Sequence, residues 1–108
     1  MTQNKKQRLL KKYQNLFNLN EWNIKIEDLF STEYMGTTDY NYFGKIAIIS
    51  IQNFLTEEEY ERTLLHEVLH IVMAPIDNYC LNKCKDKELI SQIIEHIVIR
   101  LEKGWQNK

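Results

Sequence analysis

The amino-acid sequence predicts a single small α+β domain over residues 1–108. Apolar residues recur at helical spacing toward both ends of the chain, and segments between them alternate or are rich in β-branched residues. Only three glycines and one proline interrupt these patterns. A chain of this length buries roughly two-thirds of its unfolded surface, enough for one modest core. Its 44% hydrophobic and 27% charged residues exclude a disordered chain, and its length excludes a multidomain enzyme.

The first half of the chain is expected to form one helix and a short twisted sheet of three strands. Residues 3–18 carry apolar side chains at helical spacing and predict an amphipathic helix. Residues 22–27 alternate between apolar and polar side chains, as a half-buried strand does. Residues 34–40 are a weaker strand candidate, with a bulge or close approach at Gly36. Residues 45–52 give the strongest strand signal, and a slip in their alternation predicts a bulge or a strand covered on both faces.

A capping box predicts where the central helix begins. Thr56 is followed three residues later by Glu59, and each side chain can accept a backbone hydrogen bond from the other residue. The helix is expected to span residues 57–73 and to end before Pro75, because proline disfavours helical geometry in the residue before it.

A polar connection and a C-terminal helix are expected to follow. Residues 76–86 are polar enough to predict a loop, in which Asp86 is suited to cap the next helix. That helix is predicted over residues 87–103, with Gly104 closing it.

The most informative segment is the pentapeptide from His66 to His70, which has the pattern HExxH. Residues four apart lie on one helical face, so the two imidazoles can converge on one metal ion, and Glu67 can reach a metal-bound water. Thr63, His66, Glu67 and His70 share one arc of the helical wheel, while every other residue over 64–73 is apolar. Polar groups on such a buried helix need partners, and a metal ion supplies one.

A catalytic zinc site needs a third protein ligand. The candidates are Asp77, Glu88, Glu95 and His96. Glu95 lies among apolar neighbours of the last helix and is the favoured ligand, whereas His96 lies about 100° away on a polar stripe. That stripe also contains Gln92, Arg100 and Lys103. Asp77 is suited either to orient a ligand imidazole or to cap a loop, and Glu88 to interact with the helix dipole.

On these residues the sequence resembles the zincin metallopeptidases. The HExxH helix after a hydrophobic strand carries the resemblance, and the segment Glu95–Leu101 is similar to the third-ligand helix of the glutamate-ligand (gluzincin-like) subgroup. The small size most resembles minimal zinc metallopeptidases, often encoded by phages or prophages. The resemblance covers residues from about 22 to 101 and implies a zincin-like fold with Zn²⁺ held by two histidines and a glutamate. A chain without the larger members' second domain is expected to have a narrow substrate.

The implied activity is metal-assisted hydrolysis of peptide bonds in a protein or peptide substrate. Glu67 is the expected general base, and His66, His70 and Glu95 are the expected Zn²⁺ ligands. If residues 45–52 form an edge strand, an extended peptide can add to it. An oxyanion donor is also usual, and the sequence does not choose among four tyrosines: Tyr34, Tyr40, Tyr42 and Tyr79.

Two alternative functions remain open from the sequence: a non-catalytic zinc-binding regulator and a nucleic-acid-associated interaction module. Residues 1–20 hold five bases and no acid, but the net charge of −1 makes nucleic acid an unfavoured partner. No segment is apolar enough to cross a membrane. The protein is expected in the reducing cytoplasm, where Cys80 and Cys84 would be free thiols that neither bind zinc nor form a disulfide. The oligomeric state is left open.

Overall fold

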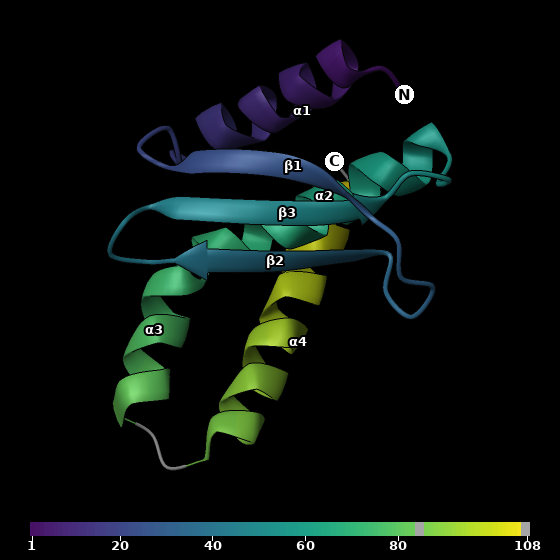
Figure 1. Ribbon diagram of the computed structural model, residues 1–108. Coiled ribbons are helices and arrows are strands. Elements are labelled where there is room, and N and C mark those ends of the chain that lie inside the picture. The colour runs from purple at the N-terminus through teal and green to yellow at the C-terminus, as the bar shows by residue number, and fades with distance from the viewer. Residues whose placement is uncertain (84–85, 107–108) are drawn as a thin grey trace.

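The structure, a computed structural model, describes residues 1–83 and 86–106, with the backbone alone over 80–83. The expectation for Cys80 and Cys84 falls outside the described side chains. The elements in chain order are α1 (Gln3–Leu16), β1 (Asn23–Leu29), β2 (Gly36–Asn41), β3 (Ile46–Gln52), α2 (Glu57–Val72), α3 (Ala74–Lys83) and α4 (Lys87–Gln106). This arrangement confirms the predicted α+β class, with three strands in one sheet and α2 behind it (Figure 1). None of the described helices is long and apolar enough to cross a membrane.

The sheet has the order β1-β3-β2, so β3 is its central strand. β3 pairs in parallel with β1 and antiparallel with β2, and both ladders are continuous. The condition for adding a peptide to residues 45–52, namely that they form an edge strand, is not met, because β3 is paired on both sides. The slip in the apolar pattern is neither a bulge nor two-sided burial: Ala47, Ile49 and Ile51 are buried, whereas Ile46 and Ile48 are 52% and 37% exposed.

The core lies between this sheet and α2. α2 contacts β2 and β3 on one side and α1, α3 and α4 on others, which explains why its second half is apolar almost all round. Ile49 and Ile51 of β3 meet the core together with Leu64, Val68 and Ile71 of α2, and all five are almost completely buried. The capping box of Thr56 and Glu59 is present at the start of α2, as predicted.

The chain turns directly from α2 into another helix. α2 ends at Val72, before Pro75 as predicted, but the expected polar loop over 76–86 is wrong, because α3 occupies most of it. Proline is tolerated in the first turn of a helix, where its missing N–H would have no partner. The carbonyl of Met73 accepts hydrogen bonds from the N–H groups of Ile76 and Asp77, at 3.1 and 3.0 Å, and so joins the two helices.

The C-terminal helix begins as predicted and continues further. The Oδ1 atom of Asp86 accepts a hydrogen bond from the N–H of Leu89 at 2.9 Å, as an N-cap does. α4 then runs through Gly104 to Gln106, so the expectation that Gly104 closes the helix is wrong. Ile94 and Val98 are its buried residues and attach it to the core.

The close approach expected at Gly36 is confirmed, and it joins β2 to α2. A Cβ atom at this position would stand 2.7 Å from Cγ2 of Thr63 and 3.3 Å from Cγ of Glu67. Thr63 has little freedom to move, since its Oγ1 donates a hydrogen bond to the carbonyl of Glu59 at 2.8 Å. The absence of a side chain at Gly36 therefore sets how near the second strand comes to the HExxH helix.

We expect Gly36→Ala to lower the free energy of unfolding by about 1–3 kcal/mol, the usual cost of overpacking a core. Thr63→Ser removes the clashing methyl group but keeps the hydroxyl, so the double variant Gly36→Ala with Thr63→Ser should recover most of the loss relative to Thr63→Ser alone. Gly104→Ala is the control, because its added Cβ meets nothing within 4 Å beyond its chain neighbours and the backbone of its own helix. Urea unfolding measures all four variants; a Gly36→Ala protein as stable as wild type would contradict the close approach.

Candidate metal site

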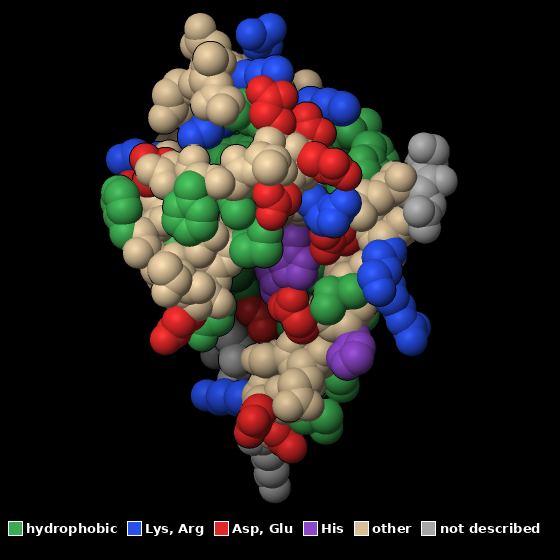
Figure 2. Space-filling model, turned by 90° about the vertical axis from the view of Figure 1, so that its right-hand side faces the viewer, with side chains coloured by type: hydrophobic (Ala, Val, Ile, Leu, Met, Phe, Trp, Pro, Cys, Tyr) green, Lys and Arg blue, Asp and Glu red, His purple; other side chains and the backbone are tan. Residues whose placement is uncertain are grey.

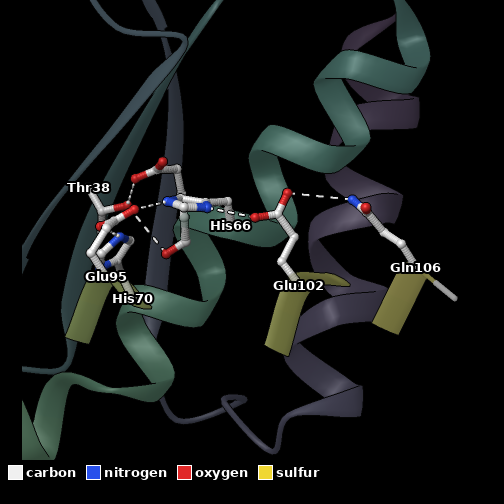
Figure 3. A network of polar contacts seen from close by, with 7 residues as sticks. Thr38, His66, His70, Glu95, Glu102 and Gln106 are labelled. Atoms are coloured by element: carbon white, nitrogen blue, oxygen red, sulfur yellow. Dashed lines mark hydrogen bonds and ion pairs between the residues drawn. The ribbon is translucent and has the colours of Figure 1, made fainter. Parts of the chain in front are cut away.

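The three residues predicted as metal ligands lie together between two helices. His66 and His70 project from α2 toward Glu95 of α4 (Figure 3). Nε2 of His66 is 2.8 Å from one carboxylate oxygen of Glu95, and Nε2 of His70 is 2.9 Å from the other. One donor atom from each residue can be chosen so that all three lie within 4.8 Å of one another. The cluster is accessible: the three side chains are 22%, 25% and 44% exposed.

Helical geometry explains why Glu95, and not His96, reaches the histidine pair. Ile94 and Val98 are buried in the core, so the side of α4 between and beside them faces α2. Glu95 lies on that side and is half-buried, whereas His96 is exposed. The rest of the polar stripe is also exposed, as predicted: Gln92, Arg100 and Lys103.

A second carboxylate, Glu102, supports the first histidine. Its Oε2 atom is 2.8 Å from Nδ1 of His66, and its other oxygen is 3.5 Å from the amide nitrogen of Gln106. A carboxylate at Nδ1 keeps the proton on that nitrogen and leaves Nε2 to bind a metal. Glu102 follows Glu95 by seven residues, nearly two full turns, so both carboxylates share one face of α4. This seven-residue spacing from Glu95 is the feature of the sequence from which a position of Glu102 near the histidines could have been predicted.

Asp77, expected either to orient an imidazole or to cap a loop, interacts with β2 instead. Its carboxylate accepts a hydrogen bond from the hydroxyl of Tyr40. Burial, together with this hydrogen bond and the charge of Asp77, raises the pKa of Tyr40 well above its ordinary value, so the phenol keeps its proton. The contact joins α3 to β2, and the carboxylate at Nδ1 of His66 is that of Glu102.

Glu67, the predicted general base, is buried next to the ligand cluster. Glu67 is only 7% exposed, and its Oε1 atom accepts a hydrogen bond from Oγ1 of Thr38 at 2.8 Å. Burial raises the pKa of Glu67, and the hydrogen bond and the neighbouring histidines oppose this only in part. A raised carboxyl pKa suits a group that must accept a proton and later release it. Sequence reasoning missed Thr38, since only the position of β2 against α2 brings it here.

The cluster opens into a groove of about 600 Å³. In Figure 2 a histidine lies in this hollow, with acidic side chains around it. Of the four candidate oxyanion donors, Tyr34 lines the groove. Tyr40 and Tyr42 pack against Trp22, and Tyr79 is exposed on α3. Glu59, Arg62 and Met35 also line the groove, so its walls combine apolar and charged groups.

The surroundings of His66 favour the charged imidazole. Burial alone would lower its pKa, but the hydrogen bond to Glu102 and the charges of Glu67, Glu95 and Glu102 outweigh burial and raise the pKa of His66 above its ordinary 6.5. Metal binding requires the neutral ring, so a metal and a proton compete for this residue.

We expect protein treated with a chelator to lose stability over the interval in which pH rises from about 6.5 through the raised pKa of His66. Because the folded-state pKa of His66 is raised, its charged form stabilises the fold fully below 6.5, and this contribution is lost as pH rises through the raised value. Thermal unfolding across this interval measures the slope. Glu102→Gln should flatten it by weakening the partner of His66; equal slopes in the two proteins would contradict this assignment.

The donor set fits a zinc ion. Two imidazole nitrogens and one carboxylate form a ligand set that zinc uses in catalytic sites, with a further position left for water or substrate. Each of the three candidate residues offers one donor atom, these atoms lie within 4.8 Å of one another, and the second ring nitrogen of His66 has a carboxylate partner. Comparison with known proteins finds no matching family model, no matching curated protein and no matching solved structure.

Proposed function

We propose that this protein is a small zinc-dependent metallopeptidase that cleaves a specific protein or peptide in a reducing cytoplasm. The observation that carries the proposal is the position of the buried Glu67 carboxylate beside the His66, His70 and Glu95 cluster, at the floor of an open groove. A metal-binding cluster alone suits a structural role, but a buried carboxylate of raised pKa beside it suits proton transfer.

Each residue of the site has a distinct role in this proposal. His66, His70 and Glu95 would hold the zinc ion, and Glu102 would orient His66 through Nδ1. When bound, zinc supplies a Lewis acid that polarises the scissile carbonyl and makes a water more acidic. Glu67 takes a proton from the water that attacks the carbonyl carbon. It then gives this proton to the amide nitrogen as the carbon–nitrogen bond breaks, so that the amine leaves neutral.

Thr38 would act as a positioning residue for Glu67. Its hydroxyl donates to the Glu67 carboxylate and also lies 3.3 Å from the carbonyl oxygen of the same residue. The hydrogen bond fixes one carboxylate oxygen and leaves the other to exchange the proton. The close approach at Gly36 keeps β2, and therefore Thr38, within reach of α2.

The edge strand beside the site is β2, which has β3 on one side only. An extended substrate would therefore pair with β2 rather than with residues 45–52, which form the central strand. β2 contacts α2 directly, and its alternate residues Gly36 and Thr38 face Glu67. A peptide added along β2 would lie beside the groove, with Tyr34 near it as the candidate to donate to a developing oxyanion.

The charge layout favours this proposal over a nucleic-acid-associated module. Of the five bases expected on the first helix, Lys6 is buried with its Nζ 5.0 Å from the ring centroid of Tyr60, and Lys5 forms an ion pair with Glu57 at 3.0 Å. A non-catalytic zinc-binding regulator would share the ligands but would not need Glu67. A measurement of peptide hydrolysis therefore distinguishes the peptidase from this regulator.

The direct test begins with elemental analysis of the purified protein, for which we expect about one zinc per chain. The zinc-loaded protein is then incubated with a proteome, and new peptide termini are identified by mass spectrometry against the Glu67→Gln variant. Cleavages present with wild type and absent with Glu67→Gln support a peptidase. Bound zinc with identical termini in both samples would favour the non-catalytic regulator.

Removing the support of His66 should weaken metal binding by an intermediate amount. We expect Glu102→Ala to raise the zinc dissociation constant about 10–100-fold, as is typical when the hydrogen-bond partner of a ligand histidine is lost. Competition with a zinc chelator measures the constant. Glu88→Ala, a change of the same type on the same helix, should leave it unchanged; equal effects of the two variants would show that Glu102 acts only through surface charge.

A further inference from the structure

α4 carries a second feature, on the side away from the candidate metal site. Four apolar side chains remain exposed there: Leu89 (49%), Ile93 (46%), Ile97 (37%) and Leu101 (46%). They are spaced four residues apart and form one continuous ridge along about 18 Å of helix. Single exposed apolar residues are common on soluble proteins, but a continuous apolar surface indicates an interaction site.

The C-terminal end of this ridge borders an apolar hollow of about 420 Å³. Leu101 forms one wall, and Leu69 and Val72 of α2 form another. Phe17 and Trp105, whose ring centroids are 5.6 Å apart, also line it, together with Arg100 and Gly104. Because mostly apolar side chains line this hollow, it is suited to bind an aliphatic side chain. Leu89, at the N-terminal end of the ridge, is an exposed side chain of that kind.

Polar residues beside the ridge give this surface a direction. The neighbouring row on α4 contains Glu88, Gln92, His96 and Arg100, all exposed. Its N-terminal end is therefore acidic and its C-terminal end basic. Two copies of the row placed antiparallel bring Glu88 of each copy opposite Arg100 of the other, so the row is complementary to itself.

We infer that this face of α4 binds the same face of a second copy of the chain, antiparallel, about a two-fold axis between Ile93 and Ile97. Ridges of residues four apart pack into one another in the commonest class of helix pair. A two-fold arrangement makes each contact twice, and Leu89 of each copy then meets the hollow beside Leu101 of the other.

The pairing leaves the groove of each copy open. At about 100° per residue, Glu95 and Glu102 point to the side of α4 opposite the middle of the ridge. The inference is therefore independent of the proposed peptidase function, and association should not change when a chelator is added. Each partner in a standard protein–protein interface buries about 800 Å², and one helix face buries less than that. The dimer should therefore be reversible and depend on protein concentration.

Sedimentation equilibrium of the full chain, with a chelator present, tests the inference. Wild type should approach twice its 13.0 kDa mass as concentration rises toward about 1 mM. Ile97→Glu places two carboxylates near the axis and should weaken association at least about 30-fold. Ile99→Glu is the matched control, because Ile99 is also 37% exposed but points to another side of α4, and it should associate like wild type. A wild type that stays monomeric, or equal effects of the two substitutions, would overturn the inference and leave the ridge to a different protein.

A charge exchange provides a test that does not depend on an apolar substitution. Glu88→Arg and Arg100→Glu each place like charges opposite one another and should weaken association about threefold or more. The double variant restores the opposite charges across the axis and should return to within about twofold of wild type. Additive losses in the double variant would exclude the antiparallel pairing.

Discussion

Replacing Glu67 with glutamine is expected to lower the rate of peptide hydrolysis by about 10²–10⁴-fold and to leave zinc in place. Glutamine has the same shape and can still accept the hydrogen bond from Thr38, but it cannot take up the proton of the attacking water. Glu67 is not among the three clustered ligand residues, so the ligand set is unchanged. The measurement is the initial rate on an identified substrate, with zinc content determined on the same sample.

The matched control for this prediction is Glu61→Gln. Glu61 is also on α2, but it is exposed and outside the ligand cluster, so its loss should alter the rate less than twofold. If Glu67→Gln retained full activity with bound zinc, the assignment of the general base would be wrong. If it lost zinc, Glu67 would have to be counted among the residues that maintain the metal site.

Removal of Glu95 is expected to weaken metal binding more than removal of the supporting residue Glu102. Glu95→Ala should raise the zinc dissociation constant by more than the 10–100-fold typical of supporting residues, because it deletes one of the three proposed ligands. It also removes the carboxylate that lies between His66 and His70 at 2.8 and 2.9 Å. Chelator competition and zinc stoichiometry after dialysis measure the loss.

His96→Ala is the control, one residue further along the same helix. His96 is exposed and lies on the polar stripe, so zinc binding should be nearly unchanged. Glu88→Ala should also have little effect, because Glu88 lies in the first turn of α4. Zinc retained in Glu95→Ala but lost in His96→Ala would instead indicate a site of three histidines.

The parts of the candidate site whose positions the sequence predicted are those fixed within one helix. The spacing of His66 and His70 places them on one face of α2 whatever surrounds it. The choice of Glu95 over its neighbour follows from the wheel of α4, where Ile94 and Val98 face the core. Helical periodicity depends only on residues within one segment, so the side of a helix on which each residue lies can be predicted from the sequence of that segment.

The parts that were missed or wrong depend on contacts between distant segments. Thr38 reaches Glu67 only because β2 lies against α2, a contact across 29 residues. The central position of β3 follows from its pairing with both other strands, which alternation within one segment does not reveal. Residues 76–86 looked like a loop because their side chains are polar, yet Pro75 at a helix start and the Met73 carbonyl allow α3 to begin at once.

The attachment of α4 has a consequence for the folding equilibrium of the protein. Within the described part of this helix, Ile94 and Val98 are the buried residues, while Glu95 and Glu102 both face the histidines of α2. Detachment of α4 by partial unfolding would remove Glu95, a proposed ligand, and Glu102, the partner of the proposed ligand His66, in one event. A metal that binds only the attached form stabilises that form by mass action. The amide protons of α4 would then exchange with solvent at a rate set by metal concentration, and the helix and the ion would dissociate as one cooperative unit.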